Sequence, residues 1–295
     1  MARWFLYKRR FLGFRINFRC ILTPYLTNKI IALTTSGRSI KDFSDRVISE
    51  GGRIIALPTI EIIPSKPNVV EQIIQTITLR DHDIVAFLSA NAVDILFDLA
   101  CKTSLVKKLI SLLDSRIIIA IGPNTKKRLE EHNLKVHLVP QKYSTQGLIE
   151  MLVSNIDLAK GKSIMIPRSG ESDALVKRSL LKLGMTAVDE VILYNVKTSR
   201  AVDNNTWREF VPILTTRKLD CIIFTSPSSV RAFFEILKNN YDLSNIEDEL
   251  SRIKSIIAIG PRTGQELKNR GIQVSIAEIH TITGAFELAK KNLTA

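Results

Sequence analysis

Four hydroxyl side chains recur at the same kind of place in the chain, where a short run of β-branched residues ends and a helical pattern begins. They are Ser89, Thr125, Ser226 and Thr263. A hydroxyl at this point can accept hydrogen bonds from the free N–H groups in the first turn of a helix. Several helix N-termini together also attract anions. Taken one at a time, each residue is equally well explained as an ordinary helix cap.

The segments around these hydroxyl groups occur twice. In both copies a strand pattern, a hydroxyl residue and a helix pattern follow one another in the same order. The matched pairs are residues 87–93 with 224–230, 119–125 with 257–263 and, more weakly, 33–37 with 166–170. Three pairs in one order and at nearly constant spacing indicate an internal duplication.

Basic side chains stand close to the same turns. They are Lys126, Lys127, Arg168, Arg231 and Arg262. Each is also typical of a solvated helix face, so only the group as a whole favours an anionic ligand. The ligand that fits several facing helix N-termini is large and carries many carboxylates or phosphates.

Other kinds of active site find no support. The sequence contains no G-x-S-x-G motif, no complete P-loop and no complete G-x-G-x-x-G fingerprint. Its three cysteines and four histidines are dispersed, so we expect no metal site, no disulfide framework and a reducing compartment. An enzyme of this kind would act by binding, orienting and shielding its substrate.

Short buried strands that alternate with amphipathic helices would position these turns. Runs such as 84–87, 117–120, 221–224 and 256–259 have the composition and length of buried parallel strands. This alternation predicts an α/β fold with parallel sheets. The turns then gather at the carboxyl ends of the strands, where such sheets bind ligands.

The length of 295 residues suits two such domains. The repeat alone leaves two arrangements open. The chain either divides near residues 158–161 or crosses over, so that one domain is built from both ends. Linker candidates are residues 64–67 and 198–205, which are polar or rich in proline.

The formal net charge of +13 indicates an anionic partner. Residues 1–29 carry seven basic residues and no acidic residue, so much of the excess is local. We expect residues 1–28 to be a basic leader outside the folded domains, either disordered or derived from a start placed too far upstream. A transit peptide or a membrane-surface helix is the alternative. The leader lacks the roughly 18 apolar residues of a membrane span, so we expect no stable membrane insertion.

Taken in order, the motifs resemble those of the uroporphyrinogen-III synthase family over nearly all of residues 29–290. The shared features are Thr34-Thr35-Ser36, the stretch 57–62, the F-x-S-x-x-A/S-V motif twice, the A-I-G-P-x-T motif twice, and the stretch 191–194. The chain departs from the family at Ala90-Asn91, where a proline is common, and at Asn195. No motif is lost through these departures.

The resemblance implies two similar flavodoxin-like parallel-sheet domains joined by a two-stranded connection, with the chain crossing over. One domain would hold residues 29–62 plus 199–295 and the other residues 67–193. Residues 63–66 and 194–198 would be linkers. We expect a cytoplasmic monomer, or an organellar one if the leader is a transit peptide.

The reaction of the family is the cyclisation of hydroxymethylbilane, a linear tetrapyrrole with eight carboxylates, to uroporphyrinogen III, with loss of water and inversion of ring D. Its members use no cofactor and hold the substrate between the domains, largely through main-chain amides. By this resemblance Tyr194 is the catalytic residue, a phenol that protonates the leaving hydroxyl. The expected substrate-binding residues are Ser36, Ser89, Thr125, Arg168, Ser226 and Thr263.

Two other functions remain open on the sequence. A non-catalytic two-lobed protein that binds an anionic metabolite would share the cleft and the repeat, and turnover of hydroxymethylbilane separates it from the enzyme. A nucleic-acid-binding protein would need basic residues interleaved with aromatic platforms. Outside the leader the aromatic residues follow apolar patterns, as Phe233 and Phe234 do, so we expect no nucleic-acid partner.

Overall fold

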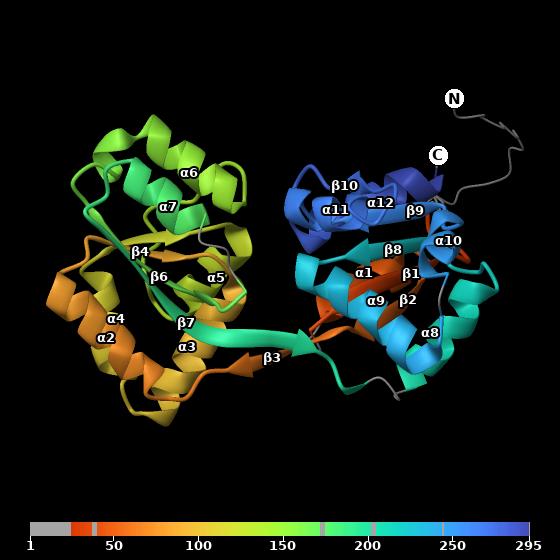
Figure 1. The fold of residues 1–295 in the computed structure, drawn as a ribbon, viewed down its shortest axis with the longest axis horizontal. Coiled ribbons are helices and arrows are strands. Elements are labelled where there is room, and N and C mark those ends of the chain that lie inside the picture. The colour runs from red at the N-terminus through yellow and green to blue at the C-terminus, as the bar shows by residue number, and fades with distance from the viewer. Residues whose placement is uncertain (1–24, 37–39, 172–174, 202–204, 244, 295) are drawn as a thin grey trace, which may run out of the picture.

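The computed structural model describes residues 25–36, 40–171, 175–201, 205–243 and 245–294, which form two α/β domains (Figure 1). The elements in chain order are β1 (Ile30–Thr35), α1 (Lys41–Ser49), β2 (Arg53–Pro58), β3 (Ile60–Pro64), α2 (Val69–Arg80), β4 (Ile84–Phe87), α3 (Ala90–Lys102), α4 (Val106–Asp114), β5 (Ile117–Ala120), α5 (Pro123–Glu131), α6 (Thr145–Ser154), η1 (Ile156–Leu158), β6 (Ser163–Ser169), α7 (Leu175–Lys182), β7 (Ala187–Thr198), α8 (Asn205–Thr215), β8 (Cys221–Phe224), α9 (Pro227–Tyr241), α10 (Ile246–Ser251), β9 (Ser255–Ala258), α11 (Pro261–Lys268), β10 (Ser275–Ile276) and α12 (Ile282–Thr294). In the described part of the chain, no helix is long and apolar enough to cross a membrane.

Domain 1 is built from both ends of the described chain. Its sheet has the order β10-β9-β8-β1-β2, and every neighbouring pair is parallel. Figure 1 shows this as red and orange elements beside blue ones in the right-hand lobe. Counted along the domain, the order is 2-1-3-4-5, which is the flavodoxin-like order. The chain therefore crosses over and does not divide near residues 158–161.

Domain 2 contains the sheet β3-β7-β6-β4-β5. Strands β4, β5, β6 and β7 are parallel, whereas β3 pairs antiparallel with the second half of β7, from Ile60 opposite Thr198 to Pro64 opposite Tyr194. In Figure 1 the long arrow of β7 runs out of the left-hand lobe toward the other domain. The stretches expected as linkers, 63–66 and 194–198, thus lie largely within this strand pair, because pairing satisfies backbone groups that a loop would leave to water.

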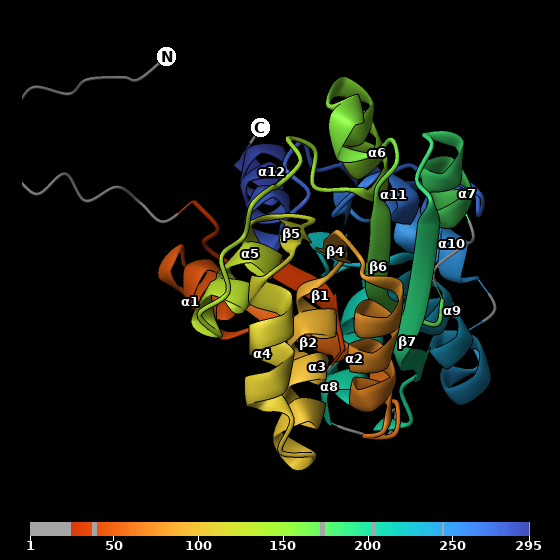
Figure 2. The ribbon, with the colours of Figure 1, turned by 90° about the vertical axis from the view of Figure 1, so that its left-hand side faces the viewer.

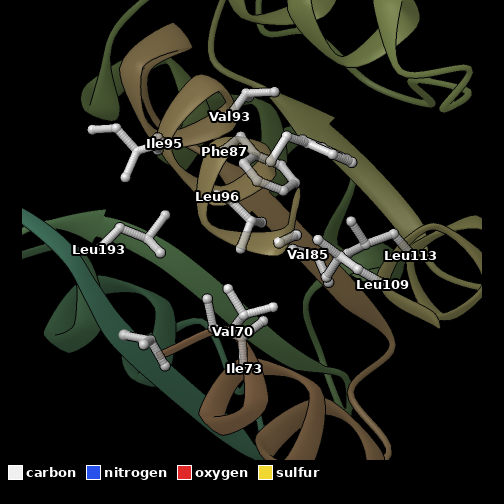
Figure 3. Close-up of a cluster of buried hydrophobic side chains, with 14 of the residues drawn as sticks. Val70, Ile73, Val85, Phe87, Val93, Ile95, Leu96, Leu109, Leu113 and Leu193 are labelled. Carbon is white, nitrogen blue, oxygen red and sulfur yellow. The ribbon is translucent and has the colours of Figure 1, made fainter. Parts of the chain in front are cut away.

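Helices cover both faces of each sheet, so central strands such as β4 and β8 are buried on both sides. In β4, Val85 and Phe87 belong to one core cluster, and Ile84 and Ala86 to another. Figure 3 shows the first cluster, in which side chains from α2, α3 and α4 pack around Val85 and Phe87. The second cluster lies under α6 and α7, which Figure 2 shows apart from α2 and α4. Two-sided burial explains why these strands read as continuous apolar runs.

In each domain, one aspartate joins the starts of two neighbouring central strands through hydrogen bonds. Asp83, just before β4, accepts hydrogen bonds from the N–H that opens β6 (2.9 Å) and from Lys162 Nζ (3.0 Å). Asp220, just before β8, accepts them from the N–H that opens β1 (2.9 Å) and from Lys29 Nζ (2.8 Å). Burial acts to raise the pKa of Asp83, but these donors outweigh it and lower that pKa.

Domain 1 begins earlier than the sequence suggested. Leu26 is completely buried, and its N–H bonds to the carbonyl oxygen of Glu50 at 2.8 Å. Lys290 Nζ lies 4.5 Å from the ring centroid of Tyr25. The expected leader boundary after residue 28 is therefore wrong for residues 25–28, because the apolar side chain of Leu26 packs into a core cluster of domain 1. Residues 1–24 of the leader lie outside the described residues.

Candidate active site between the domains

A cleft of about 860 Å³ lies between the domains, at the carboxyl ends of their parallel strands. Domain 1 contributes the end of β1 and the starts of α9, α11 and α12. Domain 2 contributes the starts of α3 and α5, and side chains of β3 and β7 also line the cleft, as do Ile40, Ser169 and Glu171. The N-termini of five helices therefore meet at one cleft, each with free N–H donors and a partial positive charge.

Tyr194 and Ser89 meet at the start of α3. Ser89 caps this helix, and its hydroxyl accepts a hydrogen bond from the N–H of Ala92 at 3.1 Å. The phenol oxygen of Tyr194 lies 3.1 Å from Ser89 Oγ, and either group can be the donor. The tyrosine is 5% exposed and both residues line the cleft. Packing thus fixes the ring while the hydroxyl reaches the positive end of a helix.

A network of buried and half-buried hydroxyl groups fixes the start of α9. Ser226 accepts a hydrogen bond from the N–H of Ser229 at 3.0 Å, and Ser229 Oγ accepts one from the N–H of Ser226 at 3.0 Å, which forms a capping box. The hydroxyl of Thr34, at the end of β1, donates to Ser229 Oγ and accepts from the N–H of Thr225, both at 3.0 Å. The ends of β1 and β8 therefore position α9 as one unit.

At the two glycine-proline turns, the side chains that face the cleft are not the ones that the sequence predicted. Thr125 and Thr263 lie in the first turns of α5 and α11, but each is only 3% exposed. Neither is among the described residues that line the cleft, whereas their neighbours Asn124 and Arg262 are. The expected contact of the two threonine side chains with the cleft is not seen, because one step along a helix turns the side chain by about 100°.

Arg168 is engaged inside domain 2. Its Nη2 donates to Glu190 Oε2 at 3.2 Å, and its Nε lies 3.0 Å from Glu190 Oε1. Its Nη1 also donates to the carbonyl oxygen of Ser169 at 3.1 Å. The guanidinium joins β6 to β7 and does not belong to the described lining of the cleft. The sequence did not reveal its partner, which is supplied by the neighbouring strand.

Four of the seven expected residues line the cleft, namely Ser36, Ser89, Tyr194 and Ser226. Sequence reasoning did not select Asn91, Asn124, Ser228 and His280, which also line the cleft, and it named Arg231 and Arg262 only as basic residues near the turns. Asn91, Asn124, Ser228 and Arg262 occupy the variable positions of the repeated motifs, so the two copies differ where they face the cleft. A search for the unchanging letters of a motif passes over such positions.

Side-chain charge in the cleft is nearly balanced. The described lining contains Arg231, Arg262, Glu171 and Glu266, together with His280. Burial lowers the pKa of His280, so this histidine is neutral at pH 7 and adds no charge. The attraction for an anion therefore comes mainly from the helix N-termini. In the described residues, no group of three or more His, Cys, Asp or Glu could hold a metal ion.

These features define a two-domain α/β protein with a ligand cleft between its lobes, suited to an anionic ligand. The family model described as uroporphyrinogen-III synthase HemD matches residues 41–287. The chain belongs to the uroporphyrinogen-III synthase family, as its ordered motifs suggested.

Individual relatives agree with this assignment. The uroporphyrinogen-III synthase of Chlorobaculum parvum is 27% identical over 251 residues, which cover 84% of this chain and 92% of the relative. Two solved structures share the fold. A mutant uroporphyrinogen III synthase from the extremely thermophilic bacterium Thermus thermophilus has a TM-score of 0.57 at 16% identity, covering 90% of this chain and 98% of that one. The uroporphyrinogen-III synthetase of Helicobacter pylori has a TM-score of 0.54 at 20% identity, covering 89% and 99%.

Proposed function

We propose that this protein is a uroporphyrinogen-III synthase, a lyase that cyclises hydroxymethylbilane to uroporphyrinogen III with loss of water and inversion of ring D. The observation that carries the proposal is the position of Tyr194, whose phenol lies in a cleft faced by five helix N-termini and 3.1 Å from Ser89 Oγ. Membership of the family over residues 41–287 supports it.

The substrate has eight carboxylates, and the cleft suits them. Free N–H groups at the starts of α3, α5, α9, α11 and α12 provide donors from both domains. Such donors belong to the backbone, so they tolerate different side chains at the variable motif positions. The cleft volume of about 860 Å³ lies in the upper part of the range for small-molecule sites, roughly 300–1,000 Å³.

In the proposed reaction Tyr194 supplies the proton for the first step. The phenol proton passes to the terminal hydroxyl of the bilane, the C–O bond breaks, and its electron pair leaves with water. Electrons from the adjoining pyrrole ring make the remaining group a reactive azafulvenium cation, which becomes the neutral azafulvene if its N–H proton is lost. Negative charge on the phenol oxygen is then stabilised by the positive end of α3 and by a hydrogen bond from Ser89.

Isomer choice would depend on how the cleft holds ring D. Without an enzyme, the bilane closes to the type I isomer. Anchoring of the carboxylates from both domains would hold the chain bent, with ring D presented in the inverted sense. A bilane that fills the cleft would also keep water away from the azafulvene.

The first prediction is the activity itself. Purified protein with hydroxymethylbilane should give the type III isomer in excess over spontaneous type I product, measured by chromatography of the oxidised porphyrins. The yield should not change when a metal chelator is added. Formation of type I product alone by folded protein would contradict the proposal.

A further inference from the structure

Glu171 links the two domains across the cleft. It follows β6 in domain 2, and its carboxylate accepts hydrogen bonds from the hydroxyl of Ser228 and from Arg231 Nη2, the latter at 3.2 Å. Both donors belong to α9 in domain 1. A carboxylate of one domain is therefore bound by the other.

The groups that hold Glu171 make a complete carboxylate site within domain 1. Ser228 lies in the first turn of α9, directly after Pro227, and this helix has 15 residues, so its N-terminus favours negative charge. Arg231 Nη1 donates to Glu266 Oε2 on α11 at 3.3 Å. Because Glu266 orients the guanidinium from within domain 1, Nη2 keeps its direction when Glu171 moves away.

The contact also lies where two hollows adjoin. Glu171, Ser228 and Arg231 line the main cleft of about 860 Å³ and also a neighbouring hollow of about 730 Å³, which continues along α9 and the end of β7. The linked side chains therefore stand between the two spaces. Separation of Glu171 from α9 would join them.

We propose that Glu171 is an internal substitute for a substrate carboxylate. It occupies the site formed by Ser228, Arg231 and the start of α9, and it holds the domains together until a carboxylate of the bilane takes its place. The identity of this ligand rests on the proposed function, since hydroxymethylbilane is the polycarboxylate in question. Substrate binding then breaks one link between the domains and forms another at the same site.

The solvent exposure of the Glu171–Arg231 pair limits the expected change in KM. The side chains of Glu171 and Arg231 are 37% and 46% exposed, so water screens their attraction. Competition by Glu171 should therefore raise the KM for hydroxymethylbilane by about two- to fivefold.

The test replaces the carboxylate by an amide of the same shape. Glu171→Gln should lower the KM for hydroxymethylbilane about two- to fivefold and leave kcat within about twofold. The matched control is Glu131→Gln, which also removes one carboxylate charge and the partner of an exposed arginine; Glu131 accepts a hydrogen bond from Arg128 at 2.9 Å within α5 of domain 2 and is not part of the described lining of the main cleft. Its KM should equal that of the parent. An unchanged or raised KM in Glu171→Gln would overturn the proposal.

A double-mutant cycle tests whether the substrate uses the same cation. Arg231→Gln should raise the KM more in the Glu171→Gln protein than in the parent, because in the parent the arginine is already engaged. Equal effects in both backgrounds would show that Glu171 and the substrate do not compete for Arg231.

Small-angle X-ray scattering without added substrate separates this inference from the proposed reaction. Glu171→Gln should have a larger radius of gyration than the parent and Glu131→Gln. The expected difference in radius of gyration does not depend on whether the parent makes type III product. Failure of the isomer assay alone would contradict only the proposed reaction. Identical scattering from all three proteins would show that the contact does not hold the domains together.

Discussion

Tyr194 is the residue on which the proposed chemistry depends. Different parts of its side chain serve packing and the proposed reaction. Its ring belongs to the core of domain 2, whereas its hydroxyl meets Ser89 at the cleft. Tyr194→Phe keeps the ring, so the free energy of unfolding should change by no more than about 1 kcal/mol, the net value of one hydrogen bond.

The same substitution should lower kcat about tenfold or more, a barrier change of at least roughly 1.4 kcal/mol, because proton donation to the leaving hydroxyl is lost. Substrate affinity should change less, since the carboxylate contacts remain. Single-turnover kinetics would measure both. Turnover within twofold of the parent would assign Tyr194 to packing alone.

Adjacent residues on α11 provide a matched pair for substrate binding. Arg262 lines the cleft, and Thr263 is buried behind it. Arg262→Gln should raise the KM several-fold with little loss of stability. Thr263→Ala should instead lower the free energy of unfolding by about 1 kcal/mol and leave the KM nearly unchanged, because it removes a buried hydroxyl. Steady-state kinetics and urea unfolding of both proteins would check this, and a reversed pattern would place the threonine in the site.

The sequence predicted the turns that form the site more accurately than the side chains that face the cleft. Strand ends followed by Ser89 and Ser226 predicted helix caps at the cleft, and both caps are present. Thr125 and Thr263 showed the same signal, yet their rotation on the helix places them in the core. That rotation and the partner of Arg168 depend on neighbouring elements, which a motif does not contain.

At the scale of elements, the two domains share structural features outside the sequence motifs that suggested a duplication. The sheet order β5-β4-β6-β7 of domain 2 corresponds to β9-β8-β1-β2 of domain 1 when repeated segments are matched. Asp83 before β4 and Asp220 before β8 each accept hydrogen bonds from the N–H that opens a neighbouring strand and from the lysine just before that strand. Ser144 and Thr281 each accept a hydrogen bond from the N–H of a glycine three residues on, Gly147 and Gly284. The duplication remains a prediction, which these correspondences support.

The strand runs predicted by composition match β4, β5, β8 and β9 closely, because burial on both faces leaves a continuous apolar signal. The pairing of β3 with β7 was less visible. Pro64, Lys197 and Thr198 have the composition of a linker, and only the partner strand makes this stretch a strand.

The packed start of domain 1 leads to a prediction about truncation. A chain that begins at Tyr25 keeps the buried side chain of Leu26, whereas a chain that begins at Lys29 loses it. The shorter protein should have a free energy of unfolding lower by about 2–5 kcal/mol, as for removal of a buried leucine. Urea unfolding of the two proteins would measure the difference. Equal stability would show that Leu26 contributes nothing to the core.

At the scale of the whole molecule, the two domains have separate hydrophobic cores. The clusters around Phe87 and Ile164 belong to domain 2, and those around Phe233 and Phe286 belong to domain 1. Among the described residues, the domains are connected by the β3–β7 pair, by the packing of α9 against these two strands and by contacts across the cleft. Unfolding should therefore not be two-state, and the calorimetric enthalpy should exceed the van't Hoff enthalpy. A single transition with equal enthalpies would show that the connection couples the domains fully.

The crossover also fixes an order of events during synthesis on the ribosome. The N–H of Ile30 that opens β1 bonds to Asp220, 190 residues later in the chain. At roughly 5–20 residues per second, this partner emerges roughly 10–40 s after the first strand. Strands β4 to β7 are complete by then, so domain 2 can fold while β1 and β2 still lack their neighbour β8. Through most of its translation the nascent chain therefore carries an apolar strand, β1, whose edge toward β8 is unpaired, and such an edge favours aggregation until β8 emerges.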